Sequence, residues 1–271
     1  MHFVSVPVSN GESRVEYLVD GSGPGVVLVH GTGAEPEANF APLIAELRER
    51  YTVVAPVLSG SGATTDPGGP LSLDDFVAQT LGAAQAAGLE HYHLVGHSLG
   101  ASVAAAAAAH APERVSSLVV HAGWARTDSW MAFQFDLWLR MLRTEPDLLA
   151  RLIQLTAMSP QALRLSSAPQ LEESAKGFSQ LFDATGMARQ IEVDLQLDIT
   201  DRLHRISSPT LVIAGTHDVI VPPHHQSELA ELIPHAQLVT LDCGHGLPFE
   251  DPQLFVKTVT AHLQAHTPRT S

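Results

Sequence analysis

The stretch His93-Leu94-Val95-Gly96-His97-Ser98-Leu99-Gly100-Ala101 decides the fold. Its apolar first half predicts a buried strand, and the alanine-rich residues that follow it predict a helix. A serine placed between a strand and a helix sits in a tight, strained turn, so the residues two before and two after it must be small. Gly96 and Gly100 meet this requirement. The pattern is typical of a nucleophile elbow, with the positive end of the helix directed at the serine oxygen.

The rest of the chain repeats this alternation of strand and helix. Short β-branched runs bounded by Gly, Pro or Asp alternate with helical patterns, which predicts an α/β fold with a mostly parallel sheet and helices on both faces. The Asn10-Gly11 turn signal predicts that the first two strands form an antiparallel hairpin at the sheet edge. Eight strands are expected, at residues 3–8, 15–19, 26–30, 52–55, 93–96, 117–121, 210–214 and 237–241. Helices are expected at about 40–50, 73–87, 99–111, 223–233 and 252–265.

The strand pattern stops after the sixth strand, and helical segments replace it over residues 123–203. An insert of about eighty residues is far longer than an ordinary connection, so it should form a structure of its own. We interpret it as a helical lid over a core domain made of residues 1–122 and 204–271. Most of its aromatic side chains are expected to form the core of the lid. These aromatic residues are Trp124, Trp130, Trp138, Phe133, Phe135, Phe178 and Phe182.

The composition excludes several classes of protein. With 45% hydrophobic and 16% charged residues, the chain should be globular rather than disordered or coiled-coil. A formal net charge of −14 repels phosphate backbones and anionic lipids, so neither nucleic acid nor a membrane is an expected partner. The single cysteine, Cys243, excludes an intramolecular disulfide and suits a reducing cytoplasm. No basic segment followed by a long apolar stretch is present at the amino terminus, so neither a signal peptide nor a membrane anchor is expected.

Two later loops supply the partners that a serine nucleophile needs, namely a base and a carboxylate that orients the base. The seventh predicted strand runs into Gly215-Thr216-His217-Asp218, and the eighth runs into Asp242-Cys243-Gly244-His245. Both loops follow the carboxyl ends of strands, where open α/β sheets bind ligands. We therefore predict that Ser98 is the nucleophile, His245 its general base and Asp218 the residue that orients His245.

The loop after the third strand, His30-Gly31-Thr32-Gly33, contains glycines that let its backbone approach Ser98. We expect the backbone N–H groups of Thr32 and Leu99 to form an oxyanion hole, a feature whose single donors stabilise a transition state by about 3 kcal/mol. His30 is interpreted as a structural hydrogen-bonding group.

Other residues are assigned to the substrate pocket or considered as metal ligands. His121 and Trp124 follow the sixth strand and should lie near the mouth of the site, and Trp130 and Phe133 of the lid are assigned to substrate binding with them. The pairs His91 with His93 and His224 with His225 have no carboxylate cluster at ligand spacing. We therefore expect no metal site.

The order Ser98, Asp218, His245, with the loop 30–33 upstream and the helical insert after the sixth strand, resembles the α/β-hydrolase superfamily over essentially the whole chain. The resemblance implies an eight-stranded sheet whose second strand is antiparallel, a lid over the site and no cofactor. It also implies acyl-enzyme chemistry on an ester, thioester, lactone or amide. The segments 30–34 and 38–40 are similar to the subgroup that hydrolyses carbon–carbon bonds in ring-cleavage products.

One segment departs from the family pattern. Many relatives carry an acidic and a basic residue after the fourth strand, in a pattern like P-D-x-R-G-x-G. This chain has Pro56-Val57-Leu58-Ser59-Gly60-Ser61-Gly62 there, so the charge pair is missing and the subgroup stays open.

The sequence thus predicts a serine hydrolase that cleaves a carboxylic ester, thioester or lactone of a small apolar acyl substrate through an acyl-enzyme at Ser98. Two alternatives stay open. In the first, the same triad performs carbon–carbon bond hydrolysis, a cofactor-free lyase reaction, or acyl transfer or cyclisation. In the second, the chain is a ligand-binding receptor with little turnover. The oligomeric state is open as well.

Overall fold

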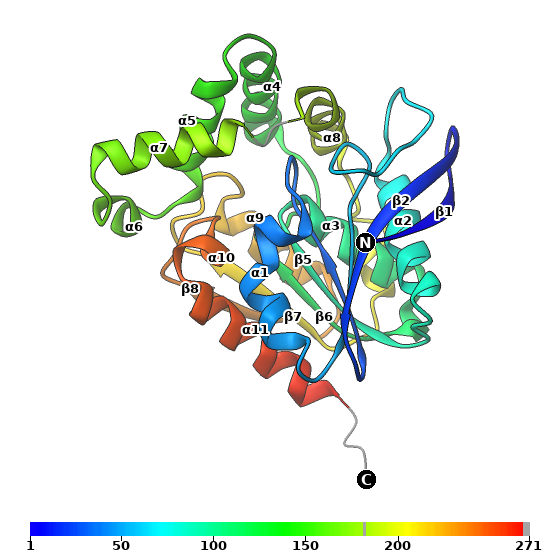
Figure 1. Ribbon diagram of the computed structural model, residues 1–271. Coiled ribbons are helices and arrows are strands. Elements are labelled where there is room, and N and C mark those ends of the chain that lie inside the picture. Colours follow the sequence, from blue (N-terminus) through cyan, green and yellow to red (C-terminus); the bar gives the residue numbers. More distant parts are fainter. Residues whose placement is uncertain (181–182, 268–271) are drawn as a thin grey trace.

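One eight-stranded sheet runs through the computed structural model, which describes residues 1–180 and 183–267 (Figure 1). The strand order is β1-β2-β4-β3-β5-β6-β7-β8. Strand β2 is antiparallel to both of its neighbours, and the other neighbouring pairs are parallel. The eight predicted strands and the edge hairpin are confirmed, although β2 is longer than predicted. The strands are β1 (His2–Val8), β2 (Gly11–Gly21), β3 (Gly25–Val29), β4 (Thr52–Pro56), β5 (Tyr92–His97), β6 (Val115–His121), β7 (Thr210–Gly215) and β8 (Gln237–Leu241).

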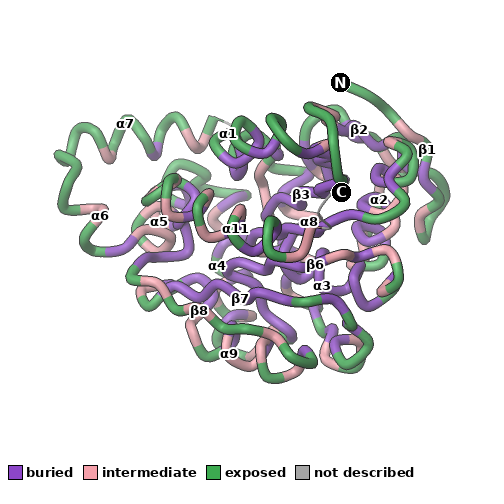
Figure 2. The backbone as a smooth tube through the Cα atoms, turned by 90° about the horizontal axis from the view of Figure 1, so that it is seen from below, coloured by how far each residue is buried: buried purple, intermediate pink, exposed green. Residues whose placement is uncertain are grey.

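Helices cover both faces of the sheet, as the side-chain alternation along β3 shows. Val26 and Leu28 point into a core formed with α1 and α11, whereas Val27 and Val29 point into the core formed with α2 and α3. In Figure 2 the central strands are largely buried, whereas the helices on either side of the sheet are partly exposed. These helices are α1 (Pro36–Leu47), α2 (Leu73–Ala86), α3 (Leu99–His110), α9 (Pro223–Leu232), α10 (Leu247–Glu250) and α11 (Pro252–His266), with short 3-10 turns at Pro112–Arg114 and Leu203–Arg205. Helix α1 begins four residues before its predicted start, because Pro36 has a backbone angle suited to the first helical position.

Five further helices lie between β6 and β7 in the described part of the chain, in the region expected to form the insert. These helices gather beyond one end of the sheet, and α6 and α7 are the most exposed of them (Figures 1 and 2). Trp124, Phe135 and Trp138 are buried and pack on one another, with ring centroids 5.5–5.8 Å apart. Phe182 lies outside the described residues. The five helices are α4 (Ser129–Thr144), α5 (Pro146–Ala157), α6 (Pro160–Arg164), α7 (Ala168–Ser179) and α8 (Ala184–Gln196).

Over the described part of the chain, no helix combines the length and the apolar character needed to cross a membrane.

Candidate active site

Ser98 occupies the strained turn that the sequence predicts between β5 and α3. Its backbone has φ 58° and ψ −126°, a conformation that residues other than glycine rarely adopt. A Cβ atom on Gly96 would lie 2.2 Å from the carbonyl oxygen of Gly100, and one on Gly100 would lie 2.1 Å from the carbonyl oxygen of Val29. Both positions therefore require glycine, because no side chain could be placed against these backbone atoms without moving them.

Ser98, His245 and Asp218 form a continuous chain of hydrogen bonds. His245 Nε2 lies 3.0 Å from Ser98 Oγ, and His245 Nδ1 lies 2.9 Å and 3.1 Å from the two carboxylate oxygens of Asp218. Asp218 also accepts from the backbone N–H of Val221 at 2.8 Å and from the side-chain amide of Gln226 at 3.1 Å. A carboxylate held in this way accepts a hydrogen bond from the Nδ1–H of His245, which leaves Nε2 unprotonated and able to accept the hydroxyl proton of Ser98.

The loop after β3 approaches Ser98 closely. A Cβ atom on Gly31 would lie 3.0 Å from Ser98 Cβ, and the N–H of Gly31 donates to Asn39 Oδ1 at 2.8 Å. Among residues 1–180 and 183–267, no hydrogen bond uses the backbone N–H of Thr32 or that of Leu99, the first residue of α3. Both N–H groups, predicted from the sequence as oxyanion donors, are thus available to a bound oxygen atom.

His30 connects the loop after β3 to the loop after β4. Its ring donates from Nδ1 to the carbonyl of Gly31 at 2.8 Å, and its Nε2 accepts from the N–H of Leu58 at 2.9 Å. Burial lowers the pKa of His30 to about 4, so the ring is neutral at pH 7. This agrees with the structural role predicted for His30.

Two more buried imidazoles lie beside the triad. The Nδ1 atoms of His97 and His121 lie 2.9 Å apart, and the ring of His97 is 5.1 Å from that of His245. Burial, with a smaller contribution from His245, lowers the pKa of His121 to about 3, and burial holds the pKa of His97 well below its usual value. Both rings are therefore neutral at pH 7 and add no positive charge beside His245.

A cavity of about 480 Å³ opens onto Ser98 and His245. Its wall is largely apolar, and the two carboxylates in it come from Glu35 and Glu37 at the start of α1. None of the described residues in the wall is a lysine or an arginine. A groove between α1 and α11 is larger, at about 660 Å³, but it contains no residue of the triad. The lining residues are Gly31, Thr32, Gly33, Ala34, Glu35, Glu37, Ala38, Asn39, His97, Ser98, Trp138, Ile153, Ala157, Phe178, Ile220, His245, Gly246 and Phe249.

The four residues assigned to substrate binding from the sequence do not line this cavity, so that assignment is corrected. The ring of His121 packs 5.4 Å from that of Phe255, in the core on the α11 side of the sheet. Trp124 is buried and donates from Nε1 to Thr127. Trp130 and Phe133 are 46% and 77% exposed, because they lie on the outer face of α4.

The cavity wall instead receives aromatic and apolar side chains from other positions of the inserted helices. Trp138 lies on the inner face of α4, seven residues after the buried Met131. Ile153 and Phe178 come from α5 and α7. At about 100° per residue, helical phase places Phe133 roughly 140° from Trp138 but Trp130 only about 80° from it, so phase could have excluded Phe133 and not Trp130.

Within residues 1–180 and 183–267, one group of side chains could hold a metal ion. The ligand atoms of Asp128, His224 and His225 lie within 4.8 Å of one another, although Asp128 is remote from the two histidines in the sequence. Asp128 comes from the start of α4, where it also accepts from the N–H of Met131 and lies 3.2 Å from His225 Nε2. His224 is largely exposed. Burial lowers the pKa of His225, so its contact with Asp128 connects α4 to α9 as a polar contact and not as an ion pair at neutral pH.

Comparisons with known proteins agree with this geometry. A sequence model of the alpha/beta hydrolase fold matches residues 24–252. Pyrrolizixenacetamide deacetylase of Xenorhabdus hominickii is 38% identical over 257 residues, which cover 94% of this chain and 97% of that protein. Putative carbamate hydrolase RutD of Azorhizobium caulinodans is 31% identical over 90% of this chain and 93% of that protein. A thermophilic esterase from Thermogutta terrifontis has a TM-score of 0.85 at 26% identity, over 98% of this chain and 100% of that chain. The chain therefore belongs to the α/β-hydrolase family and is an enzyme of the hydrolase class.

Proposed function

We propose that the enzyme is a serine hydrolase that cleaves a carboxylic ester, thioester or lactone through an acyl-enzyme at Ser98. The observation that carries this proposal is the hydrogen-bonded chain from Ser98 Oγ through His245 to Asp218, at 3.0 Å and 2.9 Å, on the wall of the cavity. The substrate is small, uncharged and largely apolar, because the cavity is of modest size and its wall is mostly apolar.

The reaction follows from these positions. Ser98 Oγ attacks the substrate carbonyl while His245 Nε2 accepts the hydroxyl proton, and Asp218 stabilises the imidazolium that forms. The N–H groups of Thr32 and Leu99 donate to the oxyanion. The leaving group then takes the proton from His245. Water repeats the sequence on the acyl-enzyme, which releases the acid and restores Ser98.

The inserted helices act as a lid in this proposal, with residues 123–203 covering a core of residues 1–122 and 204–271. Three of the helices contribute Trp138, Ile153 and Phe178 to the cavity that opens onto Ser98. An acyl group bound there would be held between the lid and the core, with its carbonyl carbon at Ser98.

An amide is the second candidate substrate. The relative at 38% identity is named a deacetylase, which favours removal of an acetyl group from an amide. The same triad performs both reactions, but an amine leaves only after it has been protonated. His245, which receives the proton of Ser98, is placed to supply it.

The other two alternatives have less support. A product of oxidative ring cleavage carries a carboxylate, and the described lining of the cavity contains Glu35 and Glu37 but no lysine or arginine to pair with that charge. A receptor without turnover does not need an acid and a base hydrogen-bonded to a serine in its pocket.

A panel of acetyl donors tests the proposal. Wild-type enzyme is assayed with p-nitrophenyl acetate, an acetyl thioester, acetanilide and a phenyl carbamate, beside Ser98→Ala and the exposed-serine control Ser166→Ala. We expect turnover of the ester or the thioester, a loss of about 10⁴-fold or more in Ser98→Ala, and no change in Ser166→Ala. Preference for acetanilide would assign the enzyme to amide deacetylation. Retained turnover in Ser98→Ala, or tight binding without any turnover, would overturn the proposal.

A further inference from the structure

Helix α8 lies against the loop that carries Thr32, and one face of the helix contacts this loop. Asp194 Oδ2 accepts a hydrogen bond from the hydroxyl of Thr32 at 2.7 Å, and Gln190 Oε1 accepts one from the N–H of Gly33 at 2.7 Å. Met187, one turn earlier, packs against Gly33, where a Cβ atom would lie 2.7 Å from the sulfur of Met187. The spacing of three and four residues places all three side chains on the same face of α8.

Gln190 also reaches the loop after β4, where the family's usual charge pair is missing. Its amide nitrogen donates to the carbonyl of Ser59 at 2.9 Å and to the hydroxyl of Ser61 at 3.1 Å, and its side chain is fully buried. The small serines leave space for this amide. Gln190 therefore connects the loop after β3 to the loop after β4 through one fully hydrogen-bonded group.

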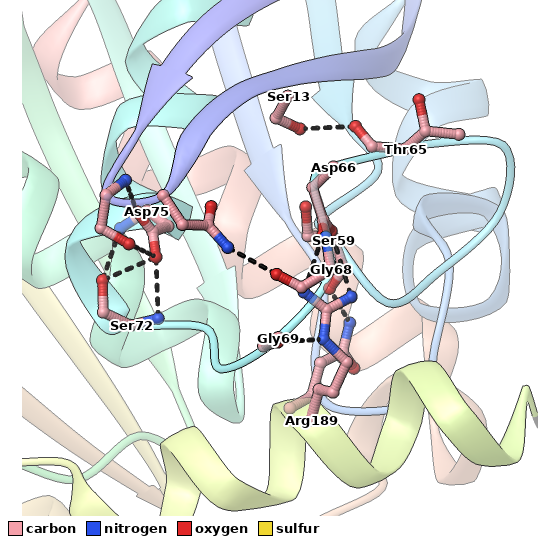
Figure 3. A network of polar contacts seen from close by, with 12 residues as sticks. Ser13, Ser59, Thr65, Asp66, Gly68, Gly69, Ser72, Asp75 and Arg189 are labelled. Atoms are coloured by element: carbon pink, nitrogen blue, oxygen red, sulfur yellow. Dashed lines mark hydrogen bonds and ion pairs between the residues drawn. The ribbon is translucent and has the colours of Figure 1, made fainter.

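The backbone of α8 approaches these loops as closely as sterics allow. A Cβ atom on Gly186 would lie 2.1 Å from the carbonyl oxygen of Gly60. Arg189 donates to both carboxylate oxygens of Asp66, at 2.7 Å and 3.1 Å, and to the carbonyl of Gly69 at 2.7 Å (Figure 3). The side chain of Asp66 is 4% exposed. This bidentate pair fixes α8 on the loop after β4, next to the residues that contact Thr32 and Gly33.

Asp194 is an unusual residue at this position. It is fully buried, and its Oδ1 atom has no hydrogen-bond partner among residues 1–180 and 183–267. A buried carboxyl group destabilises a helix interface unless its hydrogen bonds compensate. The carboxyl group of Asp194 contacts the hydroxyl of Thr32, so a role in holding Thr32 explains a carboxylate at this position better than a role in covering the core does.

We propose that Asp194 and Gln190 are positioning residues for the oxyanion hole, and this rests on the proposed function. They hold the side chain of Thr32 and the backbone N–H of Gly33, and thereby direct the N–H of Thr32 toward the oxyanion at Ser98. Interactions that act only in the transition state affect kcat more than KM, and small displacements of such donors slow the reaction strongly. Loss of these contacts should therefore lower kcat and leave KM nearly unchanged.

A double-mutant cycle on ester hydrolysis tests the Asp194 contact. Asp194→Leu and Thr32→Val should each lower kcat by about 10- to 100-fold with KM within about twofold, since one misplaced donor has an effect of this order. The double variant should be no slower than the slower single variant, and Asp194→Asn, which keeps an acceptor for Thr32, should restore most of kcat. Additive losses, an effect on KM alone, or no recovery in Asp194→Asn would overturn the proposal.

A second readout does not depend on turnover. Hydrogen exchange of the Gly33 amide should be slow in the wild type and faster in Gln190→Leu by at least about tenfold, whereas the surface control Glu192→Gln should match the wild type. Thermal unfolding of each variant shows whether it is folded. If the wild type hydrolyses none of the donors while Gly33 still loses protection in Gln190→Leu, the proposed function fails and the positioning contact stands. Unchanged exchange at Gly33 would overturn the positioning role.

Discussion

Two glutamates in the otherwise largely apolar wall of the cavity should make the enzyme discriminate against substrates that carry a carboxylate. Glu35 and Glu37 line the cavity, and no lysine or arginine among the described lining residues offsets them. Partial burial, with Glu37 and then Glu16 as neighbours, raises the pKa of Glu35, which indicates that negative charge already accumulates there. The variant that tests this carries Glu35→Gln and Glu37→Gln together.

The size of the effect follows from Coulomb's law. Two like charges about 8 Å apart near a protein surface repel by roughly 0.5–2 kcal/mol, depending on the local dielectric. Both glutamates are exposed, so the lower part of this range applies to each of them. Together they should disfavour an anionic substrate by about 1–2 kcal/mol, which is about 5- to 30-fold in kcat/KM.

The assay compares p-nitrophenyl butyrate with mono-p-nitrophenyl succinate, which have acyl chains of equal carbon number but differ in charge. At low ionic strength, Glu35→Gln/Glu37→Gln should gain about 5- to 30-fold on the succinate relative to the butyrate. A control with the same change of net charge, Glu46→Gln/Glu49→Gln, alters two exposed glutamates outside the cavity wall and should show no such gain. Equal selectivity in the wild type and both variants would refute the reasoning, as would an equal gain in the control.

Three further predictions concern the elbow, the cavity and the buried imidazoles. Gly100→Ala should yield little folded protein, because its Cβ atom would lie 2.1 Å from the carbonyl oxygen of Val29; a wild-type thermal unfolding curve would contradict this. Trp138→Ala should shift the acyl-chain preference in p-nitrophenyl ester assays toward longer chains, whereas Phe133→Ala, on the exposed face of α4, should not. Equal shifts in the two variants would contradict the placement of Trp138 in the wall of the acyl pocket. The pKa of His121 in the folded protein is lowered to about 3, whereas the unfolded value is about 6.5. Above pH 6.5 the ring is neutral in both states and His121 contributes its full stability. Between pH 6.5 and 3, only the unfolded state binds the proton, so the free energy of unfolding falls by roughly 1 kcal/mol per pH unit. Urea unfolding between pH 7 and 5 should therefore show a shallower loss of stability in His121→Asn than in the wild type, and parallel curves would contradict this assignment.

The sheet and the proximity of Ser98, His245 and Asp218 could be predicted because their signals are local. Each strand is a short β-branched run that ends in a turn, and the glycines at 96 and 100 are required by backbone atoms that contact them directly. Ser98, His245 and Asp218 each follow a strand, so the carboxyl edge of the sheet brings them together whatever the details of the helices.

The cavity wall and the contacts of α8 depend on features that the sequence does not display locally. Trp130 and Phe133 were chosen in place of Trp138 because which aromatic side chain of α4 faces the cavity depends on how the helix docks on the core. The contact between Asp194 and Thr32 joins residues 162 positions apart, and its existence depends on how α8 docks. Only the three-dimensional arrangement brings such pairs together.

The most direct test of the central claim is to identify the atom that becomes acylated. Enzyme is mixed rapidly with p-nitrophenyl acetate and quenched in acid, and the acetylated peptide is located by mass spectrometry beside a Ser98→Ala sample. The account predicts a rapid release of nitrophenol, an acetyl group on the peptide that contains Ser98, and neither in Ser98→Ala. An acetyl group on another residue, or equal nitrophenol release from Ser98→Ala, would contradict the assignment of Ser98 as the nucleophile.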